Sequence, residues 1–350
     1  MGLNHANNQS MTISDDDVLR RPVAIRNPFA VRRLSLLSHL HKAAFKVRRR
    51  LSRRFVGKPA KRLYRLLLRL GAAGKGSSFA IALPGAAARE VGFNGRNTQF
   101  GALYLPQNQP IYEPETSVLL DCLVADGDVF FDVGANWGWY ALLIASRPGF
   151  SGRVHAFEPF PETFQDLARC VGDSALGEIV TCHEVALADS DGDSAMGFSD
   201  GVQSGLARLG EAGGTRVRIA RLDSLFLPAP AVIKIDAEDH ELAVLAGAAE
   251  TIAASRPFIV FESWLHRDDP RLTLAPMEFL VERDYRFFYA GWAVGDPHCV
   301  LPSDKAPAGN MGTLALVPFL TAQRFHLPDQ LNILAVPAER MADLRGRLTA

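Results

Sequence analysis

The side chains best suited to acid–base chemistry gather after the apolar segment 231–235. Asp236, Glu238 and His240 follow one another there at intervals of two residues. A carboxylate or an imidazole can take a proton from a weakly acidic hydroxyl group while that group attacks an electrophile. Lys234 and Asp236 share one face of a strand, so we expect Asp236 to lie nearest the reacting atoms. Glu238 or His240 would accept the proton, unless both only cap or solvate the next helix.

A second pair, Glu262 and His266, follows the apolar segment 257–261. These two residues are a further acid–base candidate, and the alternative is an ordinary surface loop. Clustered carboxylates suit Mg²⁺, so Asp236, Glu238 and Glu262 could hold a divalent cation. Nothing in their spacing requires a metal, and no metal site is predicted.

A glycine turn at residues 134–138 lies between two segments of different pattern. The continuous apolar run 129–133 predicts a strand buried on both faces, and residues 139–145 predict a helix. Glycines at such a turn allow positive φ and let the backbone approach a bound ligand. The spacing is GxxxG rather than GxGxxG, so the dinucleotide-binding fingerprint is absent and an oxidoreductase is disfavoured.

A second predicted strand, 153–157, ends in Glu158, which follows Gly134 by 24 residues. In a doubly wound sheet, an acid at this place meets the ribose hydroxyls of a nucleoside held at the first turn. Asp132, at the end of the first strand, could oppose an ammonium group of the same ligand. A glycine turn alone would be an ordinary tight turn, but the ordered series of strand, turn, helix, strand and acid favours a nucleoside site.

Three further strands are predicted at 179–187, 231–236 and 257–262. Asp189 follows the first of them and could bind an adenine edge, although an Asp/Gly turn explains it equally well. Strands that alternate with helices and end in acids predict an open α/β sheet with its ligand at the carboxyl edge. The glycine-rich stretch 193–221 suits either a lid over an acceptor pocket or a β-meander.

Charge divides the chain of 350 residues into two unlike parts. Hydrophobic residues make up 48% and charged residues 22%, which is typical of a globular protein and excludes wholesale disorder or a collagen-like fibre. Residues 1–89 carry 19 Lys and Arg against 3 Asp and Glu, whereas residues 90–350 carry 19 against 35. We therefore expect a basic extension at 1–89 and a catalytic domain at 90–345.

The basic extension contains two predicted amphipathic helices, at 32–55 and 63–70, after a polar segment of low hydrophobicity. Such helices can lie on an anionic membrane, pack against the acidic part of the same protein or of another copy, or follow a phosphate backbone. Peripheral membrane contact through residues 32–70 is the favoured interpretation. Nucleic acid is the least favoured, because few aromatic residues are available to stack on bases.

The remaining composition gives expectations about compartment. Four cysteines without CxxC spacing predict reduced thiols rather than a zinc site or a disulfide scaffold. No secretory signal is visible, and apolar runs fall short of the ~20 residues that span a bilayer. We expect a cytoplasmic protein, with possible peripheral attachment to a membrane.

With these residues identified, the sequence resembles the FkbM family of S-adenosylmethionine-dependent methyltransferases over roughly residues 115–340. The matching segments, in order, are 131–138 (FDVGANWG), 156–159, 186–189 with Gly192, 222–225, 233–241 with Leu245 and 247–248, 257–262, and 332–337. The basic extension lies outside the resemblance. The family usually has glycine where this chain has Asp239, and we expect a changed local charge there rather than a lost fold.

The resemblance implies a class I, Rossmann-like methyltransferase fold with a doubly wound, mostly parallel, seven-stranded sheet. It also implies S-adenosylmethionine as cofactor and methyl transfer to a hydroxyl of a sugar, a glycan or a sugar-containing metabolite. The cofactor residues carried over by the resemblance are Asp132, Gly134, Asn136, Gly138, Glu158 and, less directly, Asp189. Two rival functions remain open: an RNA methyltransferase that uses the basic extension, and a non-catalytic nucleoside-binding scaffold in a glycan-assembly complex.

Overall fold

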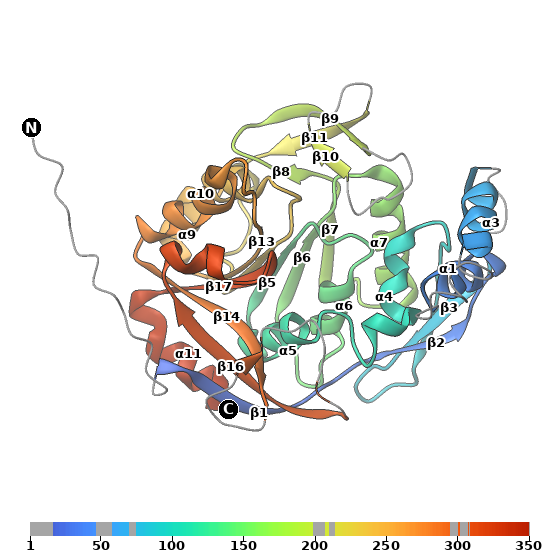
Figure 1. The fold of residues 1–350 in the computed structure, drawn as a ribbon, viewed down its shortest axis with the longest axis horizontal. Helices are drawn as coiled ribbons and strands as arrows, with labels where there is room; N and C mark the ends of the chain where they lie inside the picture. The colour runs from blue at the N-terminus through green and yellow to red at the C-terminus, as the bar shows by residue number, and fades with distance from the viewer. Residues whose placement is uncertain are drawn as a thin grey trace, which may run out of the picture.

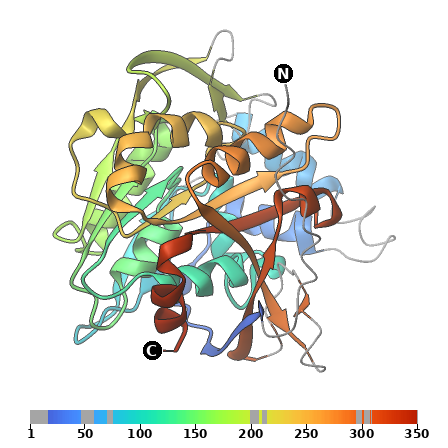
Figure 2. The ribbon, with the colours of Figure 1, turned by 90° about the vertical axis from the view of Figure 1, so that its left-hand side faces the viewer.

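The structure is a computed structural model that describes residues 17–46, 58–69, 75–198, 207–209, 214–294, 300–301, 307 and 309–349. A ten-stranded sheet forms its centre, and helices cover both faces of this sheet (Figures 1 and 2). Successive strand residues pack into two different apolar cores: Phe130 belongs to one and Phe131 to the other. This alternation explains why the central strands are apolar throughout, because each buries both of its faces.

Five strands form the parallel half of the sheet. In spatial order they are β13 (Phe258–Trp264), β12 (Val232–Ile235), β5 (Val129–Val133), β6 (Arg153–Phe157) and β7 (Val180–His183). All four neighbouring pairs in this series are parallel. The predicted α/β class is confirmed, and the carboxyl ends of β5, β6 and β12 meet at one edge as expected.

The other half of the sheet is antiparallel. It continues from β13 through β17 (Gln330–Pro337), β14 (Tyr285–Ala293), β16 (Met311–Phe319) and β1 (Leu19–Ala24), and β15 (Val300–Leu301) pairs with β14. The prediction of seven mostly parallel strands is therefore wrong, because antiparallel pairing at one edge extends the sheet to ten strands.

Each face of the sheet has its own set of helices. One core contains side chains of α5 (Pro114–Leu123), α6 (Trp139–Ala145), α7 (Pro161–Asp173) and α11 (Met341–Thr349). The other contains side chains of α8 (Glu241–Gly247), α9 (Ala249–Ser255) and α10 (Pro270–Val281). The helical segment that follows β12 consists of these first two helices, α8 and α9, which meet at Ala248.

Parts of the segment 1–89 belong to the folded body, which corrects the expected boundary between residues 89 and 90. β1 pairs with β16 in the main sheet, and β2 (Phe29–Arg33), β3 (Ser77–Ile81) and β4 (Arg89–Phe93) form a three-stranded antiparallel sheet. The boundary falls within β4. Phe29 and Phe79 pack against Trp137, with ring centroids 6.0 and 5.8 Å away. Apolar side chains of the basic segment 1–89 therefore support the turn after β5, because they pack against Trp137 within it.

Both predicted basic helices are present with different bounds: α1 (Leu36–Lys46) is shorter than the predicted 32–55, whereas α3 (Lys58–Arg69) begins five residues before the predicted 63–70. Residues 32 and 33, expected at the start of the first helix, lie in β2 instead, and residues 47–55 fall outside the described part. Pro59 lies in the first turn of α3, where its missing N–H is tolerated. None of the helices in the described residues is long and apolar enough to cross a bilayer.

A small four-stranded sheet joins the carboxyl edge of the main one. It contains β8 (Ala186–Leu187), β9 (Gly192–Phe198), β10 (Ala207–Leu209) and β11 (Thr215–Ala220). The strand predicted at 179–187 is therefore two strands, β7 and β8, in different sheets. The short helices that complete the fold are η3 (Thr98–Phe100), α4 (Gly101–Tyr104), η4 (Pro106–Asn108), η6 (Leu222–Leu225), η7 (Thr321–His326) and η8 (Ala338–Arg340).

Candidate functional site

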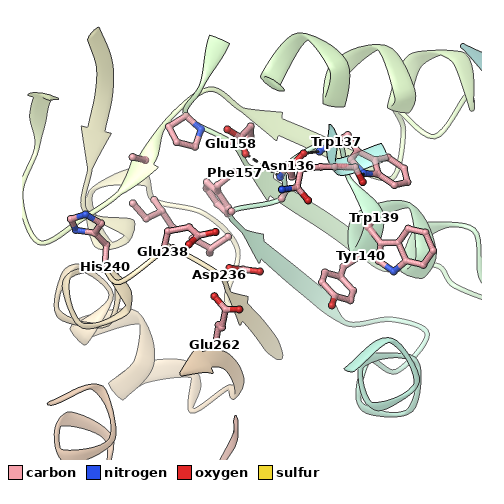
Figure 3. Close-up of a pocket in the computed structure, with 18 of the residues that line it drawn as sticks. Asn136, Trp137, Trp139, Tyr140, Phe157, Glu158, Asp236, Glu238, His240 and Glu262 are labelled. Atoms are coloured by element: carbon pink, nitrogen blue, oxygen red, sulfur yellow. Dashed lines mark hydrogen bonds between the residues drawn. The ribbon is translucent and has the colours of Figure 1, made fainter. Parts of the chain in front are cut away.

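A cavity of about 280 Å³ lies at the carboxyl ends of β5, β6, β12 and β13 (Figure 3). Six of the nine residues predicted for the site line this cavity: Gly134, Asn136, Glu158, Asp236, Glu238 and His240. The rest of the lining consists of Gln99, Ala102, Tyr112, Glu113, Val133, Ala135, Trp137, Trp139, Tyr140, Phe157, Pro159, Val185, Ala186, Leu187, Met196, Ala237, Glu262, Trp264 and Gln330. The cavity thus has an aromatic wall and several carboxyl groups.

The glycine turn is held closely between two neighbouring strands. The backbone N–H groups of Gly134 and Ala135 donate to the Phe157 carbonyl oxygen at 3.0 and 2.9 Å. Gly134 has φ +76°, and a Cβ atom at this position would lie 1.9 Å from the Asp236 carbonyl oxygen. Only glycine fits, because both the backbone angle and the contact exclude a side chain. The turn therefore presents bare backbone to the cavity.

Glu158 fixes the same turn from the end of β6. One carboxylate oxygen accepts the Asn136 N–H at 3.0 Å, and the other accepts the Phe160 N–H at 2.9 Å. Burial raises the pKa of Glu158 to about 7, although these two hydrogen bonds oppose the rise. Each oxygen keeps a second lone-pair site, so this carboxylate can still accept two hydroxyl donors from a ligand in the cavity.

Asp132, Gly138 and Asp189 are the predicted cofactor residues that do not line the cavity. Asp132 is buried beneath the turn, accepts the Ala141 N–H at 3.0 Å, and has a pKa raised to about 7 by burial. Gly138 precedes α6 with φ +96°, where a Cβ would press on a Leu167 side chain at 2.7 Å. Asp189 is exposed, and its carboxylate accepts the Ser190 hydroxyl. Asp132 therefore supports the turn through its hydrogen bond, and Gly138 supports it through close packing.

Asp236 lies beside Lys234, as strand geometry predicts. The Lys234 Nζ atom is 3.0 Å from the Asp236 Oδ2 atom and 5.4 Å from the centre of the Tyr140 ring. Lys234 is fully buried, whereas the Asp236 side chain is 31% exposed. Burial alone would lower the pKa of Lys234, but Asp236, Glu113 and Glu262 raise it above its ordinary value. This lysine therefore stays protonated and pairs with the Asp236 carboxyl group.

Two further carboxyl groups complete this corner of the cavity. Glu113, before α5, accepts the Tyr140 hydroxyl at 2.5 Å and an Asn332 amide N–H at 3.1 Å. Glu262 on β13 accepts a hydrogen bond from the Gln330 side chain, and it lies near Asp236 in Figure 3. Burial, together with the charge of Asp236, raises the pKa of Glu262 to about 9. The sequence pattern gave no signal for Glu113.

The loop that carries Glu238 and His240 has an unusual backbone. Glu238 and Asp239 both have positive φ, at 49° and 75°. A Glu241 carboxylate oxygen accepts the Ala237 N–H at 3.0 Å, and Asp239 pairs with the His266 Nε2 atom at 2.8 Å. His266 does not line the cavity, so the structure separates it from Glu262 as an acid–base partner. It instead anchors the neighbouring loop.

Within the described residues, no group of three or more His, Cys, Asp and Glu side chains is arranged to hold a metal ion. The carboxyl groups near Lys234 are instead balanced by its buried ammonium group and by hydrogen-bond donors. The described cysteines, Cys122, Cys170 and Cys182, are free thiols.

Comparison with known proteins identifies the domain around this cavity. Residues 132–287 match the family model of the methyltransferase FkbM domain. The chain carries an FkbM methyltransferase domain. This match confirms the family resemblance of the sequence, and it covers the glycine turn, Glu158, Asp236 and Glu262.

A relative and two solved structures are similar to parts of the chain. Hexuronic acid methyltransferase AglP of Haloferax volcanii is 30% identical over 141 residues, which are 39% of this chain and 56% of that protein. The FkbM methyltransferase of Methylobacillus flagellatus is 23% identical, with 55% of this chain and 44% of that one covered and a TM-score of 0.36. The S-adenosylmethionine complex of the O-methyltransferase TomG of Streptomyces achromogenes is 15% identical, with 63% and 87% covered and a TM-score of 0.36. The chain thus spans just over half the length of AglP.

The residues of the FkbM domain fit S-adenosylmethionine. Its ribose would find the buried Glu158 carboxylate, which keeps acceptor capacity on both oxygens. The bare backbone at Gly134 allows the close approach that such a ligand requires.

Proposed function

We propose that this protein is an S-adenosylmethionine-dependent O-methyltransferase whose acceptor is a hydroxyl group of a sugar or a sugar-containing molecule. One observation carries this proposal: within an FkbM domain, the glycine turn and Glu158 share a single cavity with Asp236 and Glu238. The side that we propose for the nucleoside and the side that we propose for proton acceptance therefore face the same cavity. The name of the relative AglP, a hexuronic acid methyltransferase, supports a sugar as the acceptor.

On the cofactor side, Glu158 would accept hydrogen bonds from the ribose hydroxyls, and the turn from Gly134 to Asn136 would supply the surface on which the ligand lies. Bound S-adenosylmethionine supplies a methyl group that its sulfonium already activates. The aromatic side chains Trp137, Trp139 and Tyr140 exclude water from this side of the cavity. Exclusion of water matters because electrostatic interactions strengthen in a low-dielectric site.

On the acceptor side, the protein must orient a hydroxyl group and remove its proton. The ammonium group of Lys234 pairs with Asp236 at 3.0 Å and holds its side chain in place, and Asp236 would accept a hydrogen bond from the hydroxyl. Glu238 or His240 would take the proton, since both line the same side of the cavity. Orientation by such groups also lowers the barrier, because the hydroxyl is held in line with the methyl group before the reaction.

The cofactor assignment is tested by calorimetric titration of S-adenosylmethionine and of NAD into the wild type and Glu158→Ala. Loss of hydrogen bonds to a charged acceptor costs about 1.5–3 kcal/mol, so the variant should bind S-adenosylmethionine roughly 10- to 150-fold more weakly. Glu178→Ala, which removes an exposed carboxylate outside the cavity, should bind like the wild type. Tight binding of NAD, or failure of the wild type to bind S-adenosylmethionine, would contradict the proposal.

Catalysis is tested separately with Asp236→Asn, which keeps the shape of the side chain. This variant should bind S-adenosylmethionine about as well as the wild type but should transfer methyl groups to a sugar acceptor roughly 10²-fold more slowly, because the hydroxyl loses the carboxylate that orients it. The measurement is the formation of S-adenosylhomocysteine with a panel of glycosides. A non-catalytic scaffold would bind the cofactor in both forms and produce no turnover in either.

A further inference from the structure

Helix α3 differs from the other described helices in its composition. It contains five lysines and arginines, four leucines and no acidic residue within Lys58–Arg69. It also lies in the part of the chain where the net charge is +16, whereas residues 90–350 carry −16. A short helix with this composition combines an apolar stripe with cationic side chains.

One face of α3 is fixed to the protein through aromatic contacts. Tyr64 is buried and stacks on His41 of α1, with ring centroids 5.1 Å apart and planes 13° apart. The His41 Nδ1 atom is in turn 2.8 Å from the Tyr104 hydroxyl of α4. The helices α1, α3 and α4 therefore lie side by side at one end of the molecule (Figure 1). This face of α3 is packed against its own protein.

The opposite face of α3 exposes leucine to solvent. Leu63 is 45% exposed and Leu66 is 52% exposed, and the exposed Arg62 lies next to them. Leu36, in the first turn of α1, is 59% exposed. Single exposed leucines are ordinary, but two on one helix face beside cationic side chains are typical of helices that lie in a membrane interface.

We propose that the outward face of α3, formed by Arg62, Leu63 and Leu66, binds the interface of an anionic membrane. Charge complementarity supports this occupant, since the basic segment meets negative lipid headgroups while the exposed leucines enter the acyl boundary. A phosphate backbone would attract the arginines but would leave the leucines in water. A second copy of the chain would offer its acidic part to the arginines, and this occupant is an outcome of the test below.

Attachment through α3 would fix the orientation of the cavity. His41 connects the helical pair to Tyr104, and the same short helix contributes Ala102 to the cavity wall, next to Gln99. The wall formed by η3 and α4 therefore lies between the basic helices and the site. A membrane bound by α3 would be held at a constant position relative to the cavity, whatever the acceptor is.

The experiment is flotation of the full chain with vesicles of phosphatidylcholine alone and of phosphatidylcholine mixed with phosphatidylglycerol. The wild type should bind the anionic vesicles, bind the neutral ones weakly, and dissociate as the salt concentration rises. The double variant Leu63→Ser/Leu66→Ser should lose at least roughly tenfold in partitioning, because two buried leucine side chains are removed from the interface. Arg62→Glu should lose on the order of tenfold, and its loss should shrink in high salt.

The matched control is Leu272→Ser on α10, whose leucine is 52% exposed, as is Leu66, but lies on a different part of the molecule. It should bind vesicles like the wild type. The proposal is overturned if the wild type ignores anionic vesicles at low salt, or if Leu63→Ser/Leu66→Ser binds them unchanged. It is also overturned if these leucine substitutions instead abolish binding to an RNA oligomer, or convert a dimer to a monomer by light scattering, while vesicle binding is absent.

Discussion

The carboxylate of Asp239 lies 2.8 Å from the Nε2 atom of His266 while the Asp239 backbone has a φ of 75°. Side chains are rarely tolerated at this backbone angle, and Glu238 before it has a positive φ as well. His266 is itself held in place, because its backbone N–H donates to the Thr273 hydroxyl oxygen at 2.8 Å. The glycine that the resembled family usually has at position 239 would adopt this backbone angle without strain. The pair with His266 explains how this chain accommodates aspartate there instead.

This relationship predicts different outcomes for two substitutions that both remove the carboxylate. Asp239→Gly loses the pair but relieves the left-handed backbone, so its free energy of unfolding should stay within about 1 kcal/mol of the wild type. Asp239→Ala loses the pair and keeps the strain, so it should be about 1–2 kcal/mol less stable than Asp239→Gly. Urea denaturation of the three proteins measures the difference. Equal stability of the two variants would mean that the backbone angle carries no cost.

A second prediction concerns the glycine turn. Gly134→Ala places a Cβ 1.9 Å from the Asp236 carbonyl oxygen at a φ of +76°, so the free energy of unfolding should fall by more than about 3 kcal/mol. Gly172→Ala in α7 is the control, because no atom lies within 4 Å of its Cβ position. That variant should be stabilised by up to about 1 kcal/mol. Thermal unfolding of both distinguishes a specific contact from a general effect of alanine.

The parallel half of the sheet could be predicted because burial on both faces leaves a simple signature. The expected strands 129–133 and 153–157 have the same bounds as β5 and β6. Acids at the ends of such strands had to meet at the carboxyl edge, and Glu158 and Asp236 do line one cavity there. Local pattern and the geometry of parallel sheets together carry this part of the site.

The rest of the fold depends on contacts between distant residues that no local pattern reveals. The strand Leu19–Ala24 contains two arginines and resembles a basic arm, yet its backbone pairs with Met311–Phe319. Glu113 precedes an ordinary helix and reaches the cavity only because Asn332 and Tyr140 donate hydrogen bonds to it. Asp132 occupies the expected place on β5, but its side chain turns toward the Ala141 N–H beneath the cavity.

A third prediction tests the buried ammonium group. Lys234→Met keeps the volume of the side chain but removes the positive charge that faces Asp236 at 3.0 Å. Because the partly buried Asp236 carboxyl group then loses its cationic partner, the free energy of unfolding should fall by about 2–4 kcal/mol. Arg267→Met removes the cation of an exposed pair with Asp329 and should leave stability unchanged within error. Similar losses in both variants would show that Lys234 contributes nothing beyond a surface charge.

The pKa of Glu158 predicts how cofactor binding depends on pH. Burial raises this pKa to about 7 in the free protein, and ribose hydroxyls donate to the ionised carboxylate. Below pH 7, binding must release the proton, so the affinity for S-adenosylmethionine should fall by up to about tenfold per pH unit; above pH 7 it should be constant.

Glu158→Gln should bind S-adenosylmethionine more weakly than the wild type but without this dependence on pH. The Asp132 carboxyl group, whose pKa is also raised to about 7 in the wild type, is still present in that variant. Calorimetry across this pH range therefore separates the two carboxyl groups, and a slope that persists in Glu158→Gln would assign the proton to Asp132 instead.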